Sequence, residues 1–299
     1  MVNFGVAGYP LAYSKTVYKK DRFKVLDWLN EMNLNAFEMQ MTYGPRSKKE
    51  FCLEFGKQAY EKQIVLSIHA SYFIVLTSND PIKLDNSFNT LLKTYDLADL
   101  LGVKKVILHP GPLYDLKSEI IIERLLNNLH VFFKMIGKTD IGLFLETAGK
   151  IGQFGSVMEI VKVANEFEAC FPCIDFGHVH ARTLGSLDND HAINELFLEL
   201  DSLKVFDKKR NIHFHYTPIH YGKRGEIKHK ALDDLIDDDV QGSFKFSNSI
   251  DNKYHPRFEC IIKNIYDRRI KCTVISETHN SQEIGAMEMS SYYYKLAKS

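Results

Sequence analysis

Hydrophobic residues along the chain gather in short runs that recur at a regular interval. Each run is rich in β-branched and aromatic residues, too short for an independent helix and too continuous for a strand with one solvated face. Runs of this kind are typical of parallel strands that are buried on both faces. The eight runs lie at residues 3–9, 35–41, 64–70, 105–111, 141–147, 170–176, 211–217 and 272–278.

The segments between these runs carry the hydrophobic spacing of amphipathic helices. Residues 22–33, for example, place Phe23, Leu26 and Leu29 along one stripe. Strands that alternate with helices pair in parallel through right-handed crossovers, and eight such units close a (β/α)8 TIM barrel. An open, doubly wound sheet is the alternative, but no glycine-rich phosphate loop follows the first run. Further helices are predicted at residues 87–102, 119–137, 156–168 and 281–297.

Residues 218–256 depart from this alternation. The segment is long, polar and charged, with stretches such as DDLIDDD. We predict an elaborated loop on the catalytic face between the seventh and eighth strands, together with part of the seventh helix. Neither a low-complexity tract nor an interdomain linker interrupts the chain. Residues 1–299 are therefore predicted to form a single α/β barrel domain.

Composition and charge are those of an ordinary globular protein. Of the 299 residues, 45% are hydrophobic and 25% charged, which is enough for a full core. The 38 basic and 38 acidic residues give zero formal net charge. This balance exerts no overall attraction on nucleic acid or a membrane surface, although it permits a local basic rim. No stretch is apolar over the length of a transmembrane segment, so no membrane association is expected.

The five cysteines indicate a reducing compartment. An odd number of cysteines, without the features of a secretory signal at the start of the chain, is typical of free thiols in the cytosol. A cytoplasmic location is therefore expected. Cys170 and Cys173 form a C-x-x-C pair, but the pair falls inside an apolar run and has no second pair with which to bind zinc. We interpret both residues as core.

Histidines and carboxylates stand at the ends of the predicted strands. In an α/β barrel the carboxyl ends of all strands meet at one mouth, where the active sites of such enzymes lie. A single histidine there is more often a hydrogen-bonded core residue than a ligand, but this pattern recurs at six strand ends. Clustered carboxylates repel one another unless cations compensate them. The residues are His69, His109, His178, His180, His213, His215 and His279, with Glu146, Asp175 and Glu277.

This mixture of imidazole and carboxylate favours a metal cluster. It suits Zn²⁺, Mn²⁺ or Fe, whereas an all-oxygen set would suit Mg²⁺ or Ca²⁺. His213 and His215 lie two residues apart on one strand and should face the same side, so one can bind metal while the other supports it. The candidates exceed the ligands of one zinc ion. They indicate at least two metals, an arrangement that activates water and stabilises the leaving oxygen in phosphoester hydrolysis.

Five motifs, in their order along the chain, resemble the endonuclease IV family of AP endonucleases, within the xylose-isomerase-like barrel group. They are SIHASYFIVL, VILHPG, LETAGK, CIDFGHVHAR, and HFHYTP followed by KRGEIKH. The similarity extends over nearly the whole chain, from GVAGYPLAYSK to ISETHN. It implies a trinuclear zinc centre that hydrolyses the phosphodiester 5′ to an abasic site. The implied partner is damaged duplex DNA, and the implied process is base-excision repair.

The resemblance also implies roles for individual residues. His69 and His109 look like ligands of a first zinc ion, and Glu146 looks like the carboxylate that bridges it to a second. The second ion would be completed by His215 and by two carboxylates that, with Glu146, are the expected catalytic residues: Asp175 and Glu277.

At the ligands of the third zinc ion, this sequence departs from the pattern of the family. His178 would bind it, but the Asp-x-His pair that the family places after the seventh strand is absent from HYGKRGEIKHKAL. Glu226 and His229, with two residues between them, are the expected replacements, and His220 is the alternative. Three zinc ions per chain are expected, or two if the third site is degenerate.

Three residues are candidates for DNA contact. Tyr72 and Phe73 match positions where family members present a bulky pair to the DNA, and such a wedge can fill the gap left by an extruded nucleotide. For Phe73 a place in the core is nearly as well supported. Arg46, on the loop after the second strand, is a candidate phosphate contact, although an ordinary solvated charge is the simpler interpretation.

Two other functions remain open. A xylose-isomerase-like sugar isomerase or epimerase uses the same barrel with one or two metals and needs fewer histidines. A degenerate barrel that binds metal or nucleic acid without turnover would account for the altered third-site motif. Metal stoichiometry separates the cases, at about three zinc ions per chain for the nuclease and about one for the sugar enzyme. No obligate protein partner is indicated.

Overall fold

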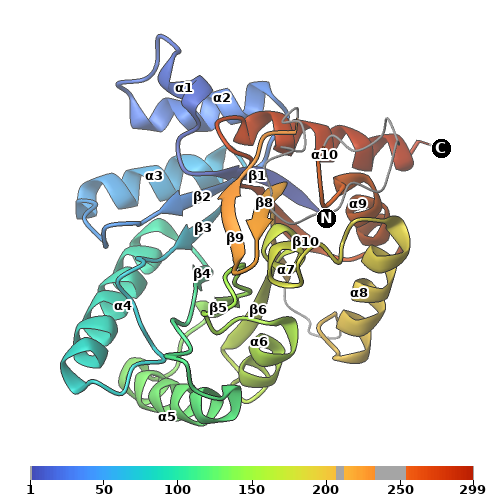
Figure 1. Cartoon of the computed structure of the whole chain (residues 1–299). Coiled ribbons are helices and arrows are strands. Elements are labelled where there is room, and N and C mark those ends of the chain that lie inside the picture. Colours follow the sequence, from blue (N-terminus) through green and yellow to red (C-terminus); the bar gives the residue numbers. More distant parts are fainter. Residues whose placement is uncertain (1, 207–211, 233–253, 299) are drawn as a thin grey trace.

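A closed barrel of eight parallel strands forms the centre of the molecule, and helices surround it (Figure 1). The computed structural model describes residues 2–206, 212–232 and 254–298. Around the barrel the order is β1-β10-β7-β6-β5-β4-β3-β2, which confirms the predicted (β/α)8 architecture. The barrel strands are β1 (Asn3–Ala7), β2 (Ala36–Gln40), β3 (Val65–His69), β4 (Lys105–Leu108), β5 (Gly142–Glu146), β6 (Cys170–Asp175), β7 (Ile212–Tyr216) and β10 (Cys272–Ser276).

Of the five helices that hydrophobic spacing predicts, four begin and end within four residues of the predicted positions, and the fifth is the exception. The predicted helix 87–102 starts six residues earlier, because Pro81 suits the first helical position and the Asp80 carboxylate accepts hydrogen bonds from the Ile82 and Lys83 amides. The helices are α1 (Leu11–Ser14), α2 (Val25–Glu31), α3 (Lys49–Glu61), α4 (Pro81–Leu101), α5 (Ser118–Ile136), α6 (Val157–Ala164), α7 (Phe176–Arg182), α8 (Asp190–Ser202), α9 (Phe258–Asp267) and α10 (Gln282–Leu296).

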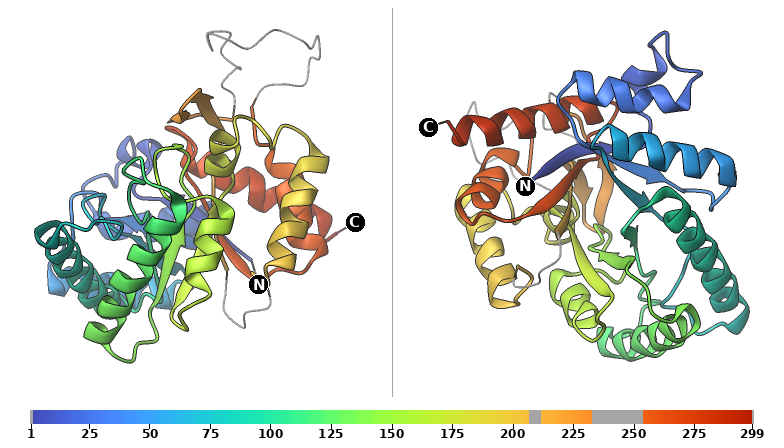
Figure 2. Two further views of the ribbon diagram at one scale, coloured as in Figure 1. Left: turned by 60° about the horizontal axis from the view of Figure 1, so that its bottom comes forward. Right: turned by 180° about the vertical axis from the view of Figure 1, so that it is seen from behind.

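A β-hairpin follows the seventh barrel strand and lies over one end of the barrel (Figure 2, left). Its antiparallel strands are β8 (Ile219–Gly222) and β9 (Gly225–His229). The elaborated loop predicted for residues 218–256 therefore contains a β-hairpin, which the sequence pattern did not predict. Gly225, with φ of +86°, allows the tight turn between the two strands. The remainder of the predicted loop, residues 233–253, lies outside the described residues.

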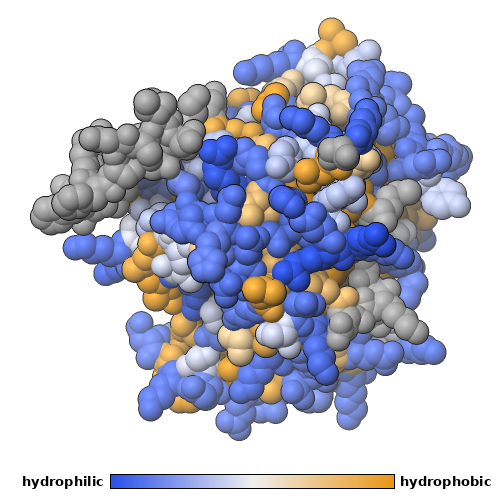
Figure 3. All heavy atoms as spheres, turned by 90° about the vertical axis from the view of Figure 1, so that its right-hand side faces the viewer, coloured by the Kyte–Doolittle hydropathy of each residue, from blue (hydrophilic) through white to orange (hydrophobic). Residues whose placement is uncertain are grey.

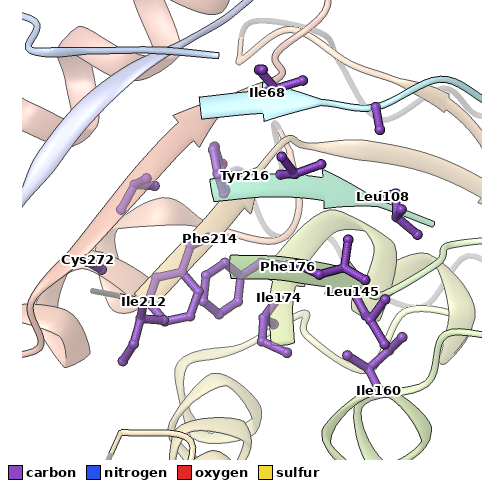
Figure 4. Packing of buried hydrophobic residues seen from close by; sticks show 14 of the residues in the cluster. Ile68, Leu108, Leu145, Ile160, Ile174, Phe176, Ile212, Phe214, Tyr216 and Cys272 are labelled. Carbon is purple, nitrogen blue, oxygen red and sulfur yellow. The ribbon is translucent and has the colours of Figure 1, made fainter. Parts of the chain in front are cut away.

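Among the described residues, buried apolar side chains pack in two separate clusters. The large one fills the space between the strands and the surrounding helices; Figure 4 shows Leu145 of β5 pointing toward Ile160 of α6, and the rings of Phe214 and Phe176 lie 5.2 Å apart. The small one lies inside the barrel and contains four residues: Ile107, Phe144, Phe171 and Cys173. The barrel interior is therefore apolar over only part of its length, which leaves room for polar layers.

The described surface is that of a globular protein. On the side shown in Figure 3, hydrophilic side chains dominate and hydrophobic ones form small separate groups. All five cysteines are buried and none forms a disulfide; for Cys170 and Cys173 in β6 this burial agrees with their interpretation as core residues. Among the described residues, no helix combines the length and apolar character needed to cross a bilayer.

Candidate metal centre

The barrel strands deliver a ring of imidazoles and carboxylates to one end of the barrel. His69, Glu146 and Asp175 are the last residues of β3, β5 and β6, while His109 and Glu277 directly follow β4 and β10. Because the strands are parallel and neighbouring, these side chains converge at the carboxyl end. The prediction that Glu146, Asp175, Glu277 and the nearby His178 surround a single mouth is confirmed by the contacts between them.

Glu146 stands at the centre of this ring, and its two carboxylate oxygens face different histidines. Oε2 lies 3.1 Å from Nε2 of His69 and 3.5 Å from Nε2 of His109. Oε1 lies 3.1 Å from Nδ1 of His215 and 3.2 Å from Nδ1 of His178. A carboxylate placed in this way can share its two oxygens between two cations.

The first ligand group consists of His69, His109 and Glu146, whose candidate ligand atoms all lie within 4.8 Å of one another. The ring of His69 is fixed by its other nitrogen, because Nδ1 lies 2.9 Å from the Ala70 carbonyl, which can only accept a hydrogen bond. In the neutral imidazole, Nε2 then carries the lone pair and points into the group. This arrangement is usual for metal-binding histidines.

The second ligand group consists of Glu146, Asp175 and His215. Asp175 caps helix α7, because its Oδ1 accepts a hydrogen bond of 2.7 Å from the His178 amide. Its Oδ2 is buried without a hydrogen-bond partner. Nδ1 of His215 is also buried and forms no hydrogen bond, although it lies 3.1 Å from Oε1 of Glu146 and 3.7 Å from Oε1 of Glu277. Buried polar atoms without partners are costly, and two of them in one group of candidate ligands fit a cation as the absent partner.

The third ligand group consists of His178, Glu226 and His229. Nε2 of His178 lies 3.7 Å from Oε2 of Glu226, whose Oε1 lies 3.7 Å from Nε2 of His229. Both rings are held by carbonyl groups, because Nδ1 of His178 lies 3.0 Å from the Thr147 carbonyl and Nδ1 of His229 lies 3.1 Å from that of Glu277. The group contains Glu226 and His229 rather than the alternative His220.

A β-bulge explains how Glu226 and His229 reach the same site. In a regular strand, residues three apart point to opposite faces. Here Tyr221 pairs with Glu226 and His220 pairs with Lys228, so Ile227 is an extra residue on strand β9. A bulge of this kind restores the alternation after one insertion. The structure thus accommodates the longer spacing of the altered motif.

The hairpin is attached to the loop that follows β5. The Glu226 amide donates to the Gly149 carbonyl at 3.0 Å, and the Ile151 amide donates to the Arg224 carbonyl at 3.1 Å. Arg182, at the end of α7, donates to the carbonyls of Lys150 and Gln153 in the same loop. The third group therefore depends on the loop as well as on the hairpin.

The ionisable groups of the ring influence one another strongly. Burial disfavours charge on Glu146, but the surrounding histidines outweigh it and hold its pKa well below the usual range. Burial likewise opposes protonation of His69, yet its hydrogen bond to Glu146 raises the pKa of His69 to about 9. At His109 burial dominates and lowers the pKa to about 3, whereas burial raises the pKa of Glu277. Such divergent pKa values are typical of functional sites.

The remaining histidines at the mouth have other surroundings. His180 is buried in α7, where its Nδ1 accepts a hydrogen bond from the Leu187 amide. His279 is exposed, with its ring beside Asn280. Neither belongs to a ligand group, so these two are ordinary structural or surface histidines.

The DNA-contact candidates lie on exposed loops. The Tyr72 and Phe73 side chains follow β3 and are 63% and 66% exposed. The core interpretation of Phe73 is therefore wrong, because the loop turns its ring outward. The Tyr72 ring centre lies 5.9 Å from that of His69, and Arg46 is exposed on the loop after β2.

Two buried polar residues beneath the ring were not among the predicted site residues. Glu38 in β2 and Ser67 in β3 are buried beside His213 and His215. A charged residue inside the apolar stretch AFEMQ was the available signal for Glu38, since burial of a carboxylate requires partners. Ser67 carries no comparable signal.

Fold and site together define an α/β barrel with several groups of metal-ligating side chains at its mouth. The chain belongs to the xylose isomerase-like TIM barrel family, whose model matches residues 26–281.

Relatives in sequence agree with this assignment and with the resemblance to endonuclease IV. An uncharacterized protein of Methanocaldococcus jannaschii is 29% identical over 236 residues, which cover 78% of this chain and 83% of the relative. A probable endonuclease 4 of Staphylococcus carnosus is 26% identical over 202 residues, 63% of this chain and 68% of the relative.

Solved structures share the fold at low identity. Endonuclease IV from Thermus thermophilus has a TM-score of 0.62 at 15% identity, covering 98% of this chain and 99% of that one. D-Psicose 3-epimerase from Clostridium cellulolyticum has a TM-score of 0.61 at 11% identity, covering 99% and 97%. The fold therefore accommodates both a nuclease and a sugar epimerase.

Proposed function

We propose that this protein is a zinc-dependent AP endonuclease that hydrolyses the phosphodiester on the 5′ side of an abasic site in duplex DNA, in base-excision repair. The observation that carries this proposal is a set of three candidate ligand groups, two of which share Glu146, while the third contains His178, whose Nδ1 lies 3.2 Å from Glu146. The second group, with Glu277 beside it, would be sufficient for a sugar enzyme with one metal. The first and third groups add four histidines and Glu226, which exceed the ligands of one metal ion.

The donor set fits zinc. Imidazole nitrogens and carboxylate oxygens are the ligands that zinc takes in catalytic sites, and the unpartnered atoms of Asp175 and His215 face the second group. His69 and His109 would hold a first ion with Glu146, and Asp175, His215 and Glu277 a second. His178, Glu226 and His229 would hold a third. Zinc ions bound there would supply a Lewis acid, activating water as the nucleophile and stabilising negative charge on the leaving oxygen.

The protein's own residues would orient the reacting groups. Glu146 is anionic and central, so it fixes the spacing between the first and second groups. Glu277 and Asp175 would hold the second ion and so help to keep the attacking water deprotonated. Asp175 accepts a hydrogen bond from the His178 amide at the N-terminus of α7 and so keeps His178 in position for the third group.

The exposed loops would bind the DNA. Tyr72 stands at the rim beside His69, where its ring would occupy the space left by the extruded abasic nucleotide. A nucleotide without a base costs little to extrude, and this provides selectivity. Phe73 would support the same wedge, and Arg46 would contact phosphate at the rim.

A sugar isomerase or epimerase is the second candidate. It is supported by the structural similarity to D-psicose 3-epimerase and by the zero net charge of the chain. It would use the second group and Glu277 alone.

A nicking assay distinguishes the two functions. Zinc-loaded protein is incubated with a duplex containing one tetrahydrofuran abasic analogue, which lacks the aldehyde needed for lyase chemistry, and with the matched undamaged duplex. We expect cleavage of the first duplex alone, 5′ to the lesion, leaving a 3′-hydroxyl. Cleavage should survive brief chelation and disappear after prolonged chelation. Absence of nicking with any divalent metal, together with epimerisation of a ketohexose, would contradict the proposal.

A further inference from the structure

A polar layer lies one step deeper in the barrel than the metal-ligating ring. The layer consists of three buried residues: Glu38 in β2, Ser67 in β3 and His213 in β7. Glu38 and Ser67 lie two residues before the last residue of their strands, and His213 lies two residues before His215. Side chains two apart on a strand share a face. These three therefore point into the barrel beneath His69 and His215.

The Glu38 carboxylate is the centre of this layer. Its Oε2 accepts hydrogen bonds of 2.9 Å from the Ser67 hydroxyl and 2.9 Å from Nε2 of His213. Its Oε1 lies 3.0 Å from Nε2 of His215 and 3.3 Å from the Gln40 amide nitrogen. Four donors around one buried carboxylate satisfy it as fully as burial of a charge requires.

The contact with His215 has a direct chemical consequence. An ionised carboxylate can only accept hydrogen bonds, so the imidazole must carry its proton on Nε2. The lone pair of the neutral ring is then on Nδ1, the atom that lies 3.1 Å from Oε1 of Glu146 and 3.7 Å from Oε1 of Glu277. We infer that Glu38 is a positioning residue that fixes the tautomer and ring orientation of His215 for metal binding.

The same layer explains the role of His213. Its Nε2 lies only 3.2 Å from Nε2 of His215, a distance at which two histidines often share a metal. Both nitrogens, however, direct a proton at Glu38. His213 and His215 therefore do not share a metal through these two nitrogens, and His213 supports His215 by packing edge-on against it, with ring centres 5.1 Å apart.

Glu38 would also add a negative charge close to cations bound at the centre. A carboxylate hydrogen-bonded to the far nitrogen of a ligating histidine increases the basicity of the ligand, and loss of such a partner typically lowers metal affinity about 10- to 100-fold. This inference rests on the proposed metal centre, because it concerns the second ligand group.

The test compares zinc binding by the Glu38→Gln and His215→Ala variants with wild type, using a competing chromophoric chelator. The glutamine side chain has the same size as the glutamate side chain, but its NH2 group donates hydrogen bonds at a position where the carboxylate oxygen accepted one. We expect Glu38→Gln to lower the affinity for one zinc ion about 10- to 100-fold and to leave the affinities for the other ions unchanged. His215→Ala should abolish binding of that same ion.

The tautomer of His215 is a readout that a merely structural role would not change, and it needs no variant to fold. Long-range ¹H–¹⁵N spectra of zinc-loaded wild-type protein should show the His215 proton on Nε2. A proton on Nδ1, or unchanged zinc affinity in a folded Glu38→Gln protein, would overturn the inference. If His215→Ala also binds zinc like wild type, the proposed second group fails as well, which separates the two claims.

Discussion

Gly149 offers a way to disturb the third ligand group without changing any ligand. A methyl group added at this position would lie 2.7 Å from Cβ and 2.8 Å from Oε2 of Glu226, and 3.2 Å from the ring of His178. Carbon atoms in ordinary contact are about 3.5–4.0 Å apart. The Gly149→Ala substitution must therefore push Glu226 away by roughly 1 Å, since the Glu226 Cβ is fixed by its own backbone.

The size of the effect follows from this displacement. Metal ligands must lie within about 0.2 Å of their ideal distances, so a shift of the Glu226 carboxylate by several times that amount removes it as a ligand. We expect the affinity for one zinc ion to fall at least about 10- to 100-fold, as for other perturbed sites. Overpacking should also lower the free energy of unfolding by about 1–3 kcal/mol.

A control substitution lies three residues away in the same loop. A methyl group at Gly152 would meet no atom within 4 Å, so Gly152→Ala should bind zinc and cleave abasic duplex like wild type. Zinc affinities of both variants would be measured by competition with a chelator. If Gly149→Ala kept wild-type affinity for every ion, the assignment of Glu226 to the third group would be refuted.

Three further predictions concern other positions. Glu146→Gln should keep the fold but lose at least one zinc ion and the nicking activity, because an amide cannot supply the charge that four histidines face; wild-type zinc content and turnover would exclude its bridging role. His229→Ala should retain two ions and lose most activity, whereas three ions with full activity would shift the assignment to His220. Lys105 is buried, and burial lowers its pKa from 10.5 to about 8. The unfolded chain therefore binds this proton more tightly, and stability should rise by about 3 kcal/mol as the pH increases from about 8 to 10.5. Denaturant unfolding at several pH values should show that Lys105→Met lacks this rise. If the free energy of unfolding changed with pH in the same way for wild type and Lys105→Met, the prediction would be contradicted.

The barrel and most of its ring could be predicted from sequence because each strand carries its own signal. Apolar runs mark strands that are buried on both faces, and a polar residue such as Glu146 at the end of a run falls at the mouth of any parallel barrel. Helices α3, α8 and α9 were not predicted, although in α8, for example, Ile193, Leu196, Phe197 and Leu200 are buried at helical spacing. The charged residues between them obscured a pattern that was present.

The third group could not be derived from spacing alone. Glu226 and His229 are three residues apart, which on a regular strand places them on opposite faces. The bulge at Ile227 depends on pairing with β8, and the position of the hairpin depends on its attachment to the β5–α6 loop. Glu38 is a similar case, because only closure of the barrel brings β2 opposite β7.

The most direct test of the three-group metal centre is a crystal structure of the zinc-loaded protein with anomalous diffraction measured at the zinc absorption edge. We predict three peaks at the barrel mouth: one among His69, His109 and Glu146; one among Glu146, Asp175, His215 and Glu277; and one among His178, Glu226 and His229. A single peak at the second position, with the histidines of the other two groups hydrogen-bonded to protein or water, would contradict the account and favour a sugar isomerase.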